Sequence, residues 1–320
     1  MRLFIHQHQS PGDILALTAA VRDLKASHPD IAINVSTTAQ ELWWYNPNLD
    51  RTVNELNADR VITSHYDLIH TSNTSGLHII DCFRMDLEQQ LGLCIAPGAR
   101  RCDVHLTDDE KEPSYARAKT GIDHGYWLVN AGHKRDFTAK QWSLERYQEV
   151  VDRTRHRITW VQIGSLEHEH RPLRNCVCLL GKTTHRELLR LMYRAGGVLT
   201  GISYPMHLST MPMPVPCRQR PCVVVAGGRE PATFTFYTNH QFLHTCGMLP
   251  CCDNGGCWKS RTIPLNDGDE KDGSLCLHPT QTPSGQTVPL CMDRITTDMV
   301  VARILDYCKY ENTQNKETDK

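Results

Sequence analysis

Short apolar runs alternate with segments whose apolar residues recur at the helical period along most of the chain. In the first third, the apolar runs predict strands at 3–7, 31–35, 60–63 and 66–70. The segments of helical period predict helices at 14–27, 40–45 and 79–91. Alternation of this kind is typical of an α/β fold with a parallel sheet.

The pattern restarts after a polar stretch at 108–121. Strands are expected at 127–130, 158–163, 177–180, 198–200 and 222–226, and helices at 143–155, 184–195 and around His207. A last helix is expected at 297–309, before a polar end at 311–320 that should be frayed. The sequence therefore predicts two doubly wound halves in tandem. Ligands of such folds bind beyond the carboxyl ends of the strands, so the cleft between the halves is the expected site.

Cysteine is concentrated near the carboxyl end, where six of the fourteen cysteines fall between Cys246 and Cys291. The residues between them are mostly turn formers, with too little apolar surface to fold by themselves. Four thiolates can hold a zinc or an iron ion, and the residues do not decide between the two metals. Unliganded thiols and a disulfide-linked finger are the alternatives. The four thiolates would come from one of the adjacent pair Cys251 and Cys252 with Cys257, Cys276 and Cys291.

Length and charge narrow the class of protein. At 320 residues the chain exceeds the usual size of one core, and we divide it into 1–121, 122–245, 246–294 and 295–320. Thirty-five Lys and Arg against thirty-six Asp and Glu argue against a general nucleic-acid or membrane-surface binder. The first residues do not resemble a secretory signal, and no apolar run is long enough to span a membrane. We therefore expect a cytoplasmic protein, in which reducing conditions favour metal ligation over disulfides.

Gly12 and Asp13 follow the first predicted strand and begin the first predicted helix. A carboxylate at this position faces the cleft, where it could take a proton from an acceptor hydroxyl while amides of the helix start hold anionic groups. Asp13 could equally cap the helix without contacting any substrate. Spacing alone does not separate these two interpretations.

Three cations, Lys134, Arg135 and Lys140, lie between a predicted strand and the following helix. Ammonium and guanidinium charges beside the amides of a helix start could clamp a diphosphate. The alternative is a solvated basic loop.

Two later strand ends carry similar residues. Thr200 and Gly201 end one strand and His207 begins the next helix, and Gly227-Gly228-Arg229-Glu230-Pro231 follows the next strand. Glycine permits close approach of the backbone to a phosphate, and a lone histidine is more often structural than a ligand. Each of these loops alone is a weak indication of a phosphate-binding site. Their occurrence at the ends of successive strands is stronger evidence.

Several common motifs are absent from the sequence. There is no Gly-x-Gly-x-x-Gly fingerprint, no Walker loop and no Gly-x-Ser-x-Gly elbow, which argues against a dinucleotide dehydrogenase, a P-loop enzyme and a serine hydrolase. His168 and His170 could be metal ligands, but a solvated turn is the favoured interpretation.

The loops together resemble one family. Pro11-Gly12-Asp13-Ile14 with the segment 18–25 is similar to the first loop and helix of the ADP-heptose glycosyltransferases, the heptosyltransferases of lipopolysaccharide assembly. Lys140-Gln141-Trp142-Ser143 and the two strand ends just described match that family's phosphate- and nucleotide-side loops in order. The resemblance covers most of the chain and implies the GT-B fold, two Rossmann-like domains facing a cleft. It implies Asp13 as the catalytic base and, on the donor side, Gly12, Lys134, Lys140, Thr200, Gly201, His207, Gly228 and Arg229.

The cysteine-rich segment resembles the metal finger of the bacterial autotransporter heptosyltransferases, on Cys257-Trp258, 275–279 and Cys291. That resemblance implies a structural metal ion in each chain, iron in those proteins, in a finger away from the chemistry, and assembly into large rings. The chain departs from them in its Cys251-Cys252 pair, the wider spacing to Cys257 and its shorter amino-terminal part. The predicted ligands are Cys252, Cys257, Cys276 and Cys291.

The function expected from these features is that of an inverting glycosyltransferase that moves a sugar, heptose from ADP-heptose, to a hydroxyl acceptor without a catalytic divalent ion. The acceptor could be a protein Ser or Thr, a saccharide or a hydroxylated nucleobase, and the protein could be a homo-oligomer. The alternative is an inactive binding module whose finger contacts nucleic acid or protein. Lys259 and Arg261 beside Trp258 support that alternative, because cations near an aromatic ring can engage phosphate and base.

Overall fold

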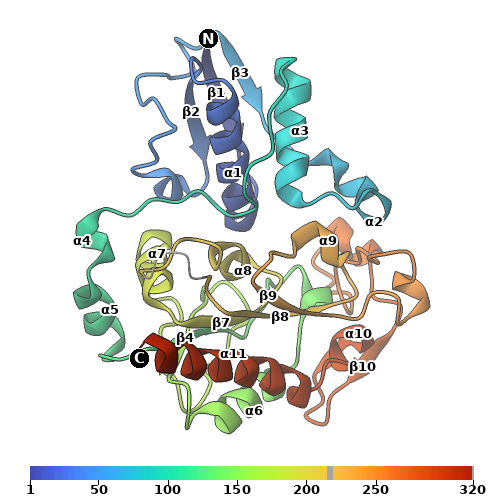
Figure 1. Cartoon of the computed structure of the whole chain (residues 1–320). Coiled ribbons are helices and arrows are strands. Elements are labelled where there is room, and N and C mark those ends of the chain that lie inside the picture. Colours follow the sequence, from blue (N-terminus) through green and yellow to red (C-terminus); the bar gives the residue numbers. More distant parts are fainter. Residues whose placement is uncertain (215–218, 319–320) are drawn as a thin grey trace.

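The computed structural model describes residues 1–214 and 219–318. Within them the chain forms two α/β halves, one above the other, and a cysteine-rich segment on the second half (Figure 1). The strands are β1 (Arg2–Gln7), β2 (Ala32–Thr37), β3 (Arg60–Thr63), β4 (Trp127–Asn130), β5 (Trp160–Gln162), β6 (Val177–Cys178), β7 (Gly197–Gly201), β8 (Cys222–Gly227), β9 (His240–His244), β10 (Pro279–Gln281) and β11 (Thr287–Pro289). The helices are α1 (Pro11–Ser27), α2 (Ser72–Ser75), α3 (Ile79–Leu91), α4 (Asp108–Lys111), α5 (Pro113–Thr120), α6 (Leu144–Thr154), α7 (His185–Arg194), α8 (Tyr204–Leu208), α9 (Ala232–Thr235), α10 (Leu290–Asp293) and α11 (Thr297–Thr318).

The amino-terminal half is built on a parallel sheet of order β2-β1-β3. Helix α1 follows β1 and begins at Pro11, whose fixed φ suits the first helical position and which lacks an N–H that would be unpaired there. Nearly every residue from Ile14 to Leu24 is buried, because α1 lies between α3 and, across the interface, α8 of the other half. The start of α1 is thereby fixed at the boundary between the halves.

The carboxyl-terminal half contains a parallel sheet of order β6-β5-β4-β7-β8-β9. Its inner strands are covered on both faces, so β4 and β8 are buried throughout and their sequences are mostly continuous apolar runs. In Figure 1, α7 and α8 lie between this sheet and the first half, and α6 and α11 lie on the opposite side. The predicted α/β architecture with parallel sheets is confirmed.

The segment that connects the two halves packs against the second half. Helices α4 and α5 lie within the predicted first domain, yet both pack against α7. Arg186 on α7 is buried and pairs with Glu110 on α4, which anchors the connection.

One predicted element of the first half is wrong, and another is shorter than expected. The segment 66–70 was expected to be a strand, but it forms a 3₁₀ helix, Asp67–Thr71. The Tyr66 ring packs edge-on against Phe83 of α3, 5.1 Å between centroids, which turns the chain away from the sheet. The helix expected at 40–45 is present as a short 3₁₀ helix, Gln40–Trp43, which buries Leu42 and Trp43.

In the second half, strand β9 was not expected. It is an edge strand whose histidines and glutamine leave only a partly apolar face, so its sequence does not show the apolar run of a covered strand. Helix α11 continues to Thr318 where a frayed end was predicted from 311, because extending an existing helix costs less than starting one. Residues 319–320 of that predicted end lie outside the described residues. None of the described helices has both the length and the apolar character needed to cross a membrane.

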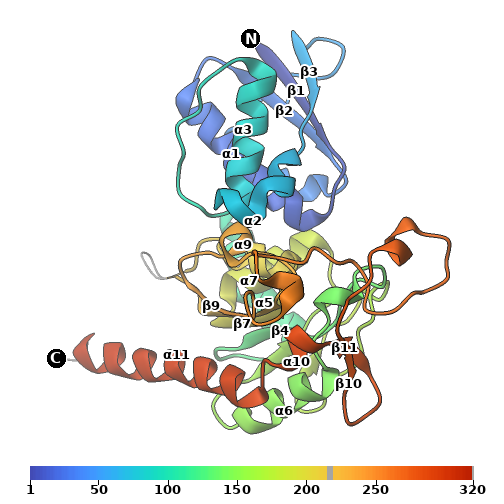
Figure 2. The same ribbon diagram turned by 90° about the vertical axis from the view of Figure 1, so that its right-hand side faces the viewer.

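The cysteine-rich segment, 246–294, has little regular structure beyond the antiparallel hairpin β10–β11 and short helical turns. Figure 2 shows it looping out beside the second half. Arg261 is fully buried in it, and its guanidinium donates to Asp267 at 2.8 Å and pairs with Asp272. A buried cation ringed by carboxylates therefore organises the polar run that the sequence left without a core.

Candidate functional site

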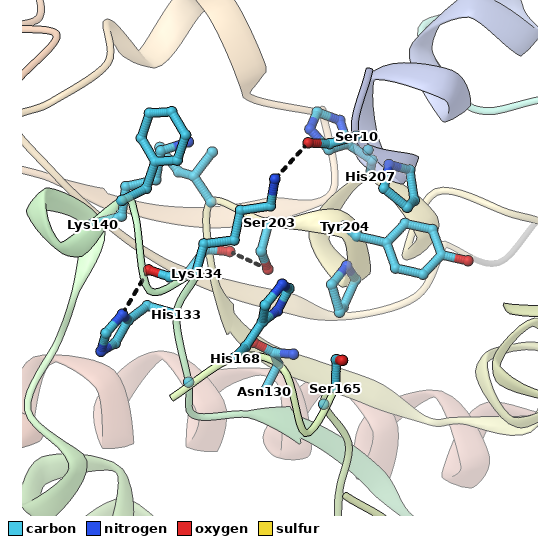
Figure 3. A pocket seen from close by; sticks show the side chains of 18 of the residues that line it. Ser10, Asn130, His133, Lys134, Lys140, Ser165, His168, Ser203, Tyr204 and His207 are labelled. Atoms are coloured by element: carbon cyan, nitrogen blue, oxygen red, sulfur yellow. Dashed lines mark hydrogen bonds between the residues drawn. The ribbon is translucent and has the colours of Figure 1, made fainter. Parts of the chain in front are cut away.

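A cavity of about 860 Å³ separates the two halves. The start of α1 lines it from the first half, and the loops after β4, β5, β7 and β8 line it from the second, where the carboxyl ends of parallel strands meet (Figure 3). The structure brings seven of the predicted residues together in its wall: Gly12, Asp13, Lys134, Lys140, Gly201, His207 and Arg229.

Asp13 both caps α1 and faces the cavity. The Ser10 backbone N–H donates to Asp13 Oδ2 at 3.0 Å, so the capping interpretation is correct as far as it goes. Burial raises the pKa of Asp13 to about 6, and Glu230 adds to this, while Lys140, the hydrogen bond from Ser10 and Lys134 oppose it. A carboxylate with this pKa is mostly ionised at neutral pH and is a stronger base than an exposed one.

Tyr66 lies beside Asp13. Burial, the charges of Asp13 and Glu230, and a hydrogen bond to Asp13 all raise the pKa of Tyr66 far above its ordinary value. The phenol therefore stays protonated and can donate to the carboxylate.

Gly12 allows α1 to approach α8. A Cβ at Gly12 would lie 3.1 Å from His207 Cδ2, so a side chain there would require the His207 ring to shift. The His207 ring is fixed by a 2.8 Å hydrogen bond between its Nδ1 and the Tyr237 hydroxyl. Burial lowers the pKa of His207 to about 4, so it is a neutral ring at pH 7.

The cations of the cavity wall come from the second half. Lys134 Nζ reaches across to donate to Ser10 Oγ at 2.9 Å, as Figure 3 shows. Lys140 Nζ and Arg229 Nη1 each lie 2.5 Å from the same oxygen of Glu230. Burial alone would raise the pKa of Glu230, but Lys140 and Arg229 hold it below its ordinary value.

Of the three cations predicted to lie together on the loop after β4, Arg135 does not line the main cavity. Arg135 is exposed and lines a separate pocket of about 270 Å³ with Asp136, Glu167 and Asp267. Its place in the main cavity is taken by Arg229, which lies on another loop, because the backbone turns after Lys134 and directs Arg135 outwards.

Arg229 is held on several sides. Its Nε donates to the Lys259 carbonyl at 2.6 Å, and its guanidinium lies 5.4 Å from the ring centre of Phe137 and 5.3 Å from that of Trp258. Cations over aromatic rings gain about 0.5–2 kcal/mol each. The residue is therefore presented to the cavity in one fixed orientation.

Two predicted donor-side residues lie behind the wall. Thr200 is fully buried, and its hydroxyl is 2.8 Å from Ser203 Oγ. A Cβ at Gly228 would lie 2.8 Å from Cys252 Sγ, so Gly228 faces the cysteines and not the cavity.

The histidine loop after β5 also differs from expectation. The expected turn is present at 165–168 and Ser165, Leu166, Glu167 and Glu169 are exposed, but His168 and His170 are half-buried and line the cavity. Burial lowers the pKa of His170 to about 4, and His168 and His133 add to this. The loop folds inwards because Gly132 and Gly164 leave room for the His170 ring.

Three of the four predicted metal ligands, Cys252, Cys257 and Cys291, lie beside one glycine, Gly228. Cys252 and Cys291 are buried against Gly227 and Gly228, and the Cys257 N–H donates to the Gly228 carbonyl at 3.2 Å. Burial and the nearby thiols of Cys257, Cys276 and Cys252 together raise the pKa of Cys291 to about 11, against a hydrogen bond from the Gly228 backbone.

This group of thiols includes more than the predicted four. Cys246 and Cys251 also lie near enough for Cys252, Cys257 and Cys291 to raise the pKa of their thiols, after burial. In 1–214 and 219–318, no three Cys, His, Asp or Glu side chains are arranged to hold a metal ion. The cysteine-rich segment was predicted to lie away from the site of the chemistry. In the structure it adjoins the cavity, because Trp258 lines the cavity and the Cys257 N–H donates to the carbonyl of Gly228, the residue before Arg229.

Sequence reasoning missed Tyr66, Glu230 and Trp258 as parts of the site. Glu230 follows Arg229 in a motif already singled out, and Trp258 follows a predicted ligand, so their positions in the sequence gave a signal. Nothing in the sequence around Tyr66 marks it.

Two parallel α/β halves that meet at the carboxyl ends of their strands define the GT-B fold. The structure is similar to ADP-heptose LPS heptosyltransferase II of E. coli, with a TM-score of 0.62 and 14% identity over 98% of this chain and 100% of that one. It is similar to TibC, an iron-containing dodecameric glycosyltransferase of enterotoxigenic E. coli H10407, with a TM-score of 0.61 and 16% identity over 97% and 76%.

A glycosyl transferase of family 9 from Veillonella parvula DSM 2008 matches with a TM-score of 0.59 and 18% identity, over 76% of this chain and 86% of that one. No protein-family model and no curated protein sequence matches the chain. At these identities the likeness establishes the fold.

Proposed function

We propose that the protein is an inverting glycosyltransferase that uses a nucleotide-diphosphate sugar, with ADP-heptose as the donor. One observation carries the proposal: Asp13 of the first half faces Lys134, Lys140 and Arg229 of the second across a single cavity. A base and a cluster of cations on opposite walls suit a reaction in which a hydroxyl loses a proton while a diphosphate departs.

In the proposed reaction, Asp13 takes the proton of the acceptor hydroxyl as its oxygen attacks the anomeric carbon of the sugar. The bond between that carbon and the diphosphate oxygen breaks, and its electron pair stays on the diphosphate. Lys140, Arg229 and Lys134 stabilise the negative charge that develops there. Because attack and departure occur on opposite faces in one displacement, the product has inverted configuration.

The choice of donor rests on the neighbours of this fold. Heptosyltransferase WaaC of E. coli has been solved with ADP and TibC with ADP-D-β-D-heptose. The GT-B arrangement and the cation cluster of this chain are compatible with the same class of donor.

We also propose a structural metal ion, zinc or iron, on Cys252, Cys257, Cys276 and Cys291. The chemistry of the donor set fits, because thiolates suit either ion and the thiols of Cys252, Cys257 and Cys276 lie near enough to Cys291 to raise its pKa. Binding requires these thiols to move closer together, since among the described residues no three metal-ligating side chains are arranged to hold an ion. The ion would tie the cysteine-rich segment to the end of β8. Elemental analysis of the purified protein tests this, with the Cys252→Ser variant expected to lose metal. TibC is described as dodecameric, and light scattering would show whether this chain also assembles.

The binding-module alternative loses its specific support. Arg261 is buried among aspartates, the Lys259 carbonyl binds Arg229, and Trp258 lines the cavity. Arg261 and Trp258 are therefore engaged inside the protein, and the outward recognition surface expected from them does not form.

The test of the proposed function is hydrolysis and transfer with a panel of nucleotide sugars. We expect ADP release from ADP-heptose by the natural protein and none by Asp13→Asn. ADP should also raise the melting temperature of both, because Asp13 does not hold the diphosphate. A natural protein that neither binds ADP nor turns over any donor contradicts the proposal.

A further inference from the structure

A row of aromatic side chains leads away from Asp13 along the cavity wall. The rings of Tyr66 and Phe234 lie 6.5 Å apart between centroids, and those of Phe234 and Trp258 lie 5.4 Å apart. All three line the cavity, together with Ile69. The row draws on the first half, on α9 and on the cysteine-rich segment, so the segment supplies part of the wall.

The position of Trp258 is fixed by Asn73 of the first half. Its indole Nε1 donates to Asn73 Oδ1 at 2.9 Å, and the Gly256 N–H donates to the same oxygen at 3.0 Å. Asn73 Nδ2 in turn donates to the Gly256 carbonyl at 2.8 Å. One side chain thus makes three hydrogen bonds from the first half to the turn that carries Trp258.

The turn fits tightly between the two halves. A Cβ at Gly256 would lie 2.4 Å from the Arg229 carbonyl oxygen, and one at Gly255 would lie 2.9 Å from Asn73. The Trp258 N–H donates to the Arg229 carbonyl at 2.9 Å. Trp258 is therefore held in place by both halves.

Charge is divided unequally across the cavity. The first half contributes the carboxylates of Asp13 and Glu41 to the wall, and the second half contributes two lysines and an arginine together with the carboxylates of Glu167 and Glu230. The lysines and the arginine attract an anionic donor, which leaves the aromatic row to the acceptor. At the Tyr66 end of the row the charges of Asp13 and Glu230 raise the pKa of Tyr66 more than the charge of Arg229 lowers it, so an anionic acceptor would lose free energy there.

We propose that Tyr66, Ile69, Phe234 and Trp258 form the acceptor subsite, and that it takes an uncharged hydroxyl compound with an apolar face. Trp258 contacts the acceptor, and Asn73 is a positioning residue that acts through Trp258. Aromatic side chains bind such faces through dispersion while Tyr66 and Asp13 meet the hydroxyl. The inference rests on the proposed function and assigns the substrate class of its second site.

The subsite can be tested with matched acceptors. The probes are a neutral aryl glycoside and its 6-phosphate, and a blocked peptide with one Ser flanked by Ala or by Glu. Each is added to the protein with ADP-heptose, and both transfer and inhibition of donor hydrolysis are followed. In each pair, the neutral compound should accept the sugar or inhibit donor hydrolysis at a lower concentration than its anionic partner. Whether the glycoside pair or the peptide pair shows this difference tells whether a saccharide or a peptide supplies the hydroxyl.

Variants separate positioning from folding. Ile69→Ala and Asn73→Ala should each raise the acceptor KM roughly three- to tenfold, the effect of one lost contact. Ile69→Ala should leave ADP binding unchanged, whereas Trp258→Ala should weaken both acceptor and ADP binding, because the Trp258 ring also packs on Arg229. A purely structural role of Ile69 would impair donor and acceptor steps together. Trp44→Ala is the matched control, because Trp44 is exposed on the first half, outside the cavity.

The outcomes are distinct. The subsite is refuted if the anionic acceptors work as well as the neutral ones, or if no neutral compound acts while donor hydrolysis proceeds. It is also refuted if Ile69→Ala and Asn73→Ala both leave the acceptor KM unchanged. Absence of ADP binding and donor turnover in the natural protein instead overturns the proposed function, and this inference falls with it.

Discussion

Replacing Asp13 by Asn should abolish transfer and at the same time stabilise the fold at neutral pH. Asn keeps the size of the side chain and an oxygen that can accept from the Ser10 N–H, so the cap on α1 is preserved. The substitution removes only the buried negative charge, which destabilises the folded protein. Burial, the largest cause, raises the pKa of this carboxyl from its ordinary 3.8 to about 6.

The size of the effect follows from that shift. One pKa unit corresponds to about 1.4 kcal/mol, so ionised Asp13 lowers the free energy of unfolding by about 3 kcal/mol. Because the pKa is raised in the folded protein, the carboxyl is protonated in both states at acid pH and costs nothing there. The cost builds as the pH rises from about 4 and is complete above about 6. The gain of the Asn variant should appear across the same window.

Urea unfolding of both proteins at acid and at neutral pH measures this difference. The control is Asp50→Asn, because hydrogen bonds from Thr52 hold the pKa of half-buried Asp50 below its ordinary value and the sign of the effect is therefore opposite. Equal stability of Asp13→Asn and the natural protein at neutral pH would refute the reasoning. A gain of the same size at acid pH would refute it too, since that gain could not come from the charge.

Three further predictions concern the same loops. Glu230→Gln leaves Lys140 and Arg229 without their carboxylate and should cost about 3 kcal/mol, seen as a lower melting temperature that ADP partly restores; an unchanged melting temperature contradicts it. Gly228→Ala places a Cβ 2.8 Å from Cys252 Sγ, so Cys252 should react faster with iodoacetamide than in the natural protein, and an equal rate would show that the thiols are not packed on this glycine. The kcat/KM for transfer should fall about tenfold for each pH unit below about 6 as Asp13 becomes protonated, and a flat acid limb would exclude it as the base.

The sequence was informative wherever one strand determines the position of a loop. The covered strands β4, β7 and β8 are continuous apolar runs, so their carboxyl ends, and with them Lys140, Gly201 and Arg229, could be placed at a common edge in advance. Asp13 was placed in the same way from β1. These predictions need only the periodicity of a single element and the geometry of a parallel sheet.

The sequence was uninformative wherever the site depends on contacts between distant segments. Tyr66 reaches Asp13 because its ring packs on Phe83, and Trp258 reaches the cavity because Asn73 holds it, 185 residues away in the chain. Neither contact produces a periodic pattern of apolar residues in the sequence, so neither could be predicted from it. Arg135 shows the converse, because it belongs to the predicted loop and yet turns outwards.

The loop after β8 explains why the cysteine-rich segment cannot be considered apart from the cavity. Gly228 packs against Cys252 and binds Cys257 through its carbonyl, and the next two residues, Arg229 and Glu230, face the cavity. A shift of the thiols therefore moves the backbone that positions Arg229 and, through Glu230, the Lys140 ammonium. Interiors are packed too closely to absorb such a shift locally. Whatever binds the thiols thus acts on the same residues that are proposed to hold the donor.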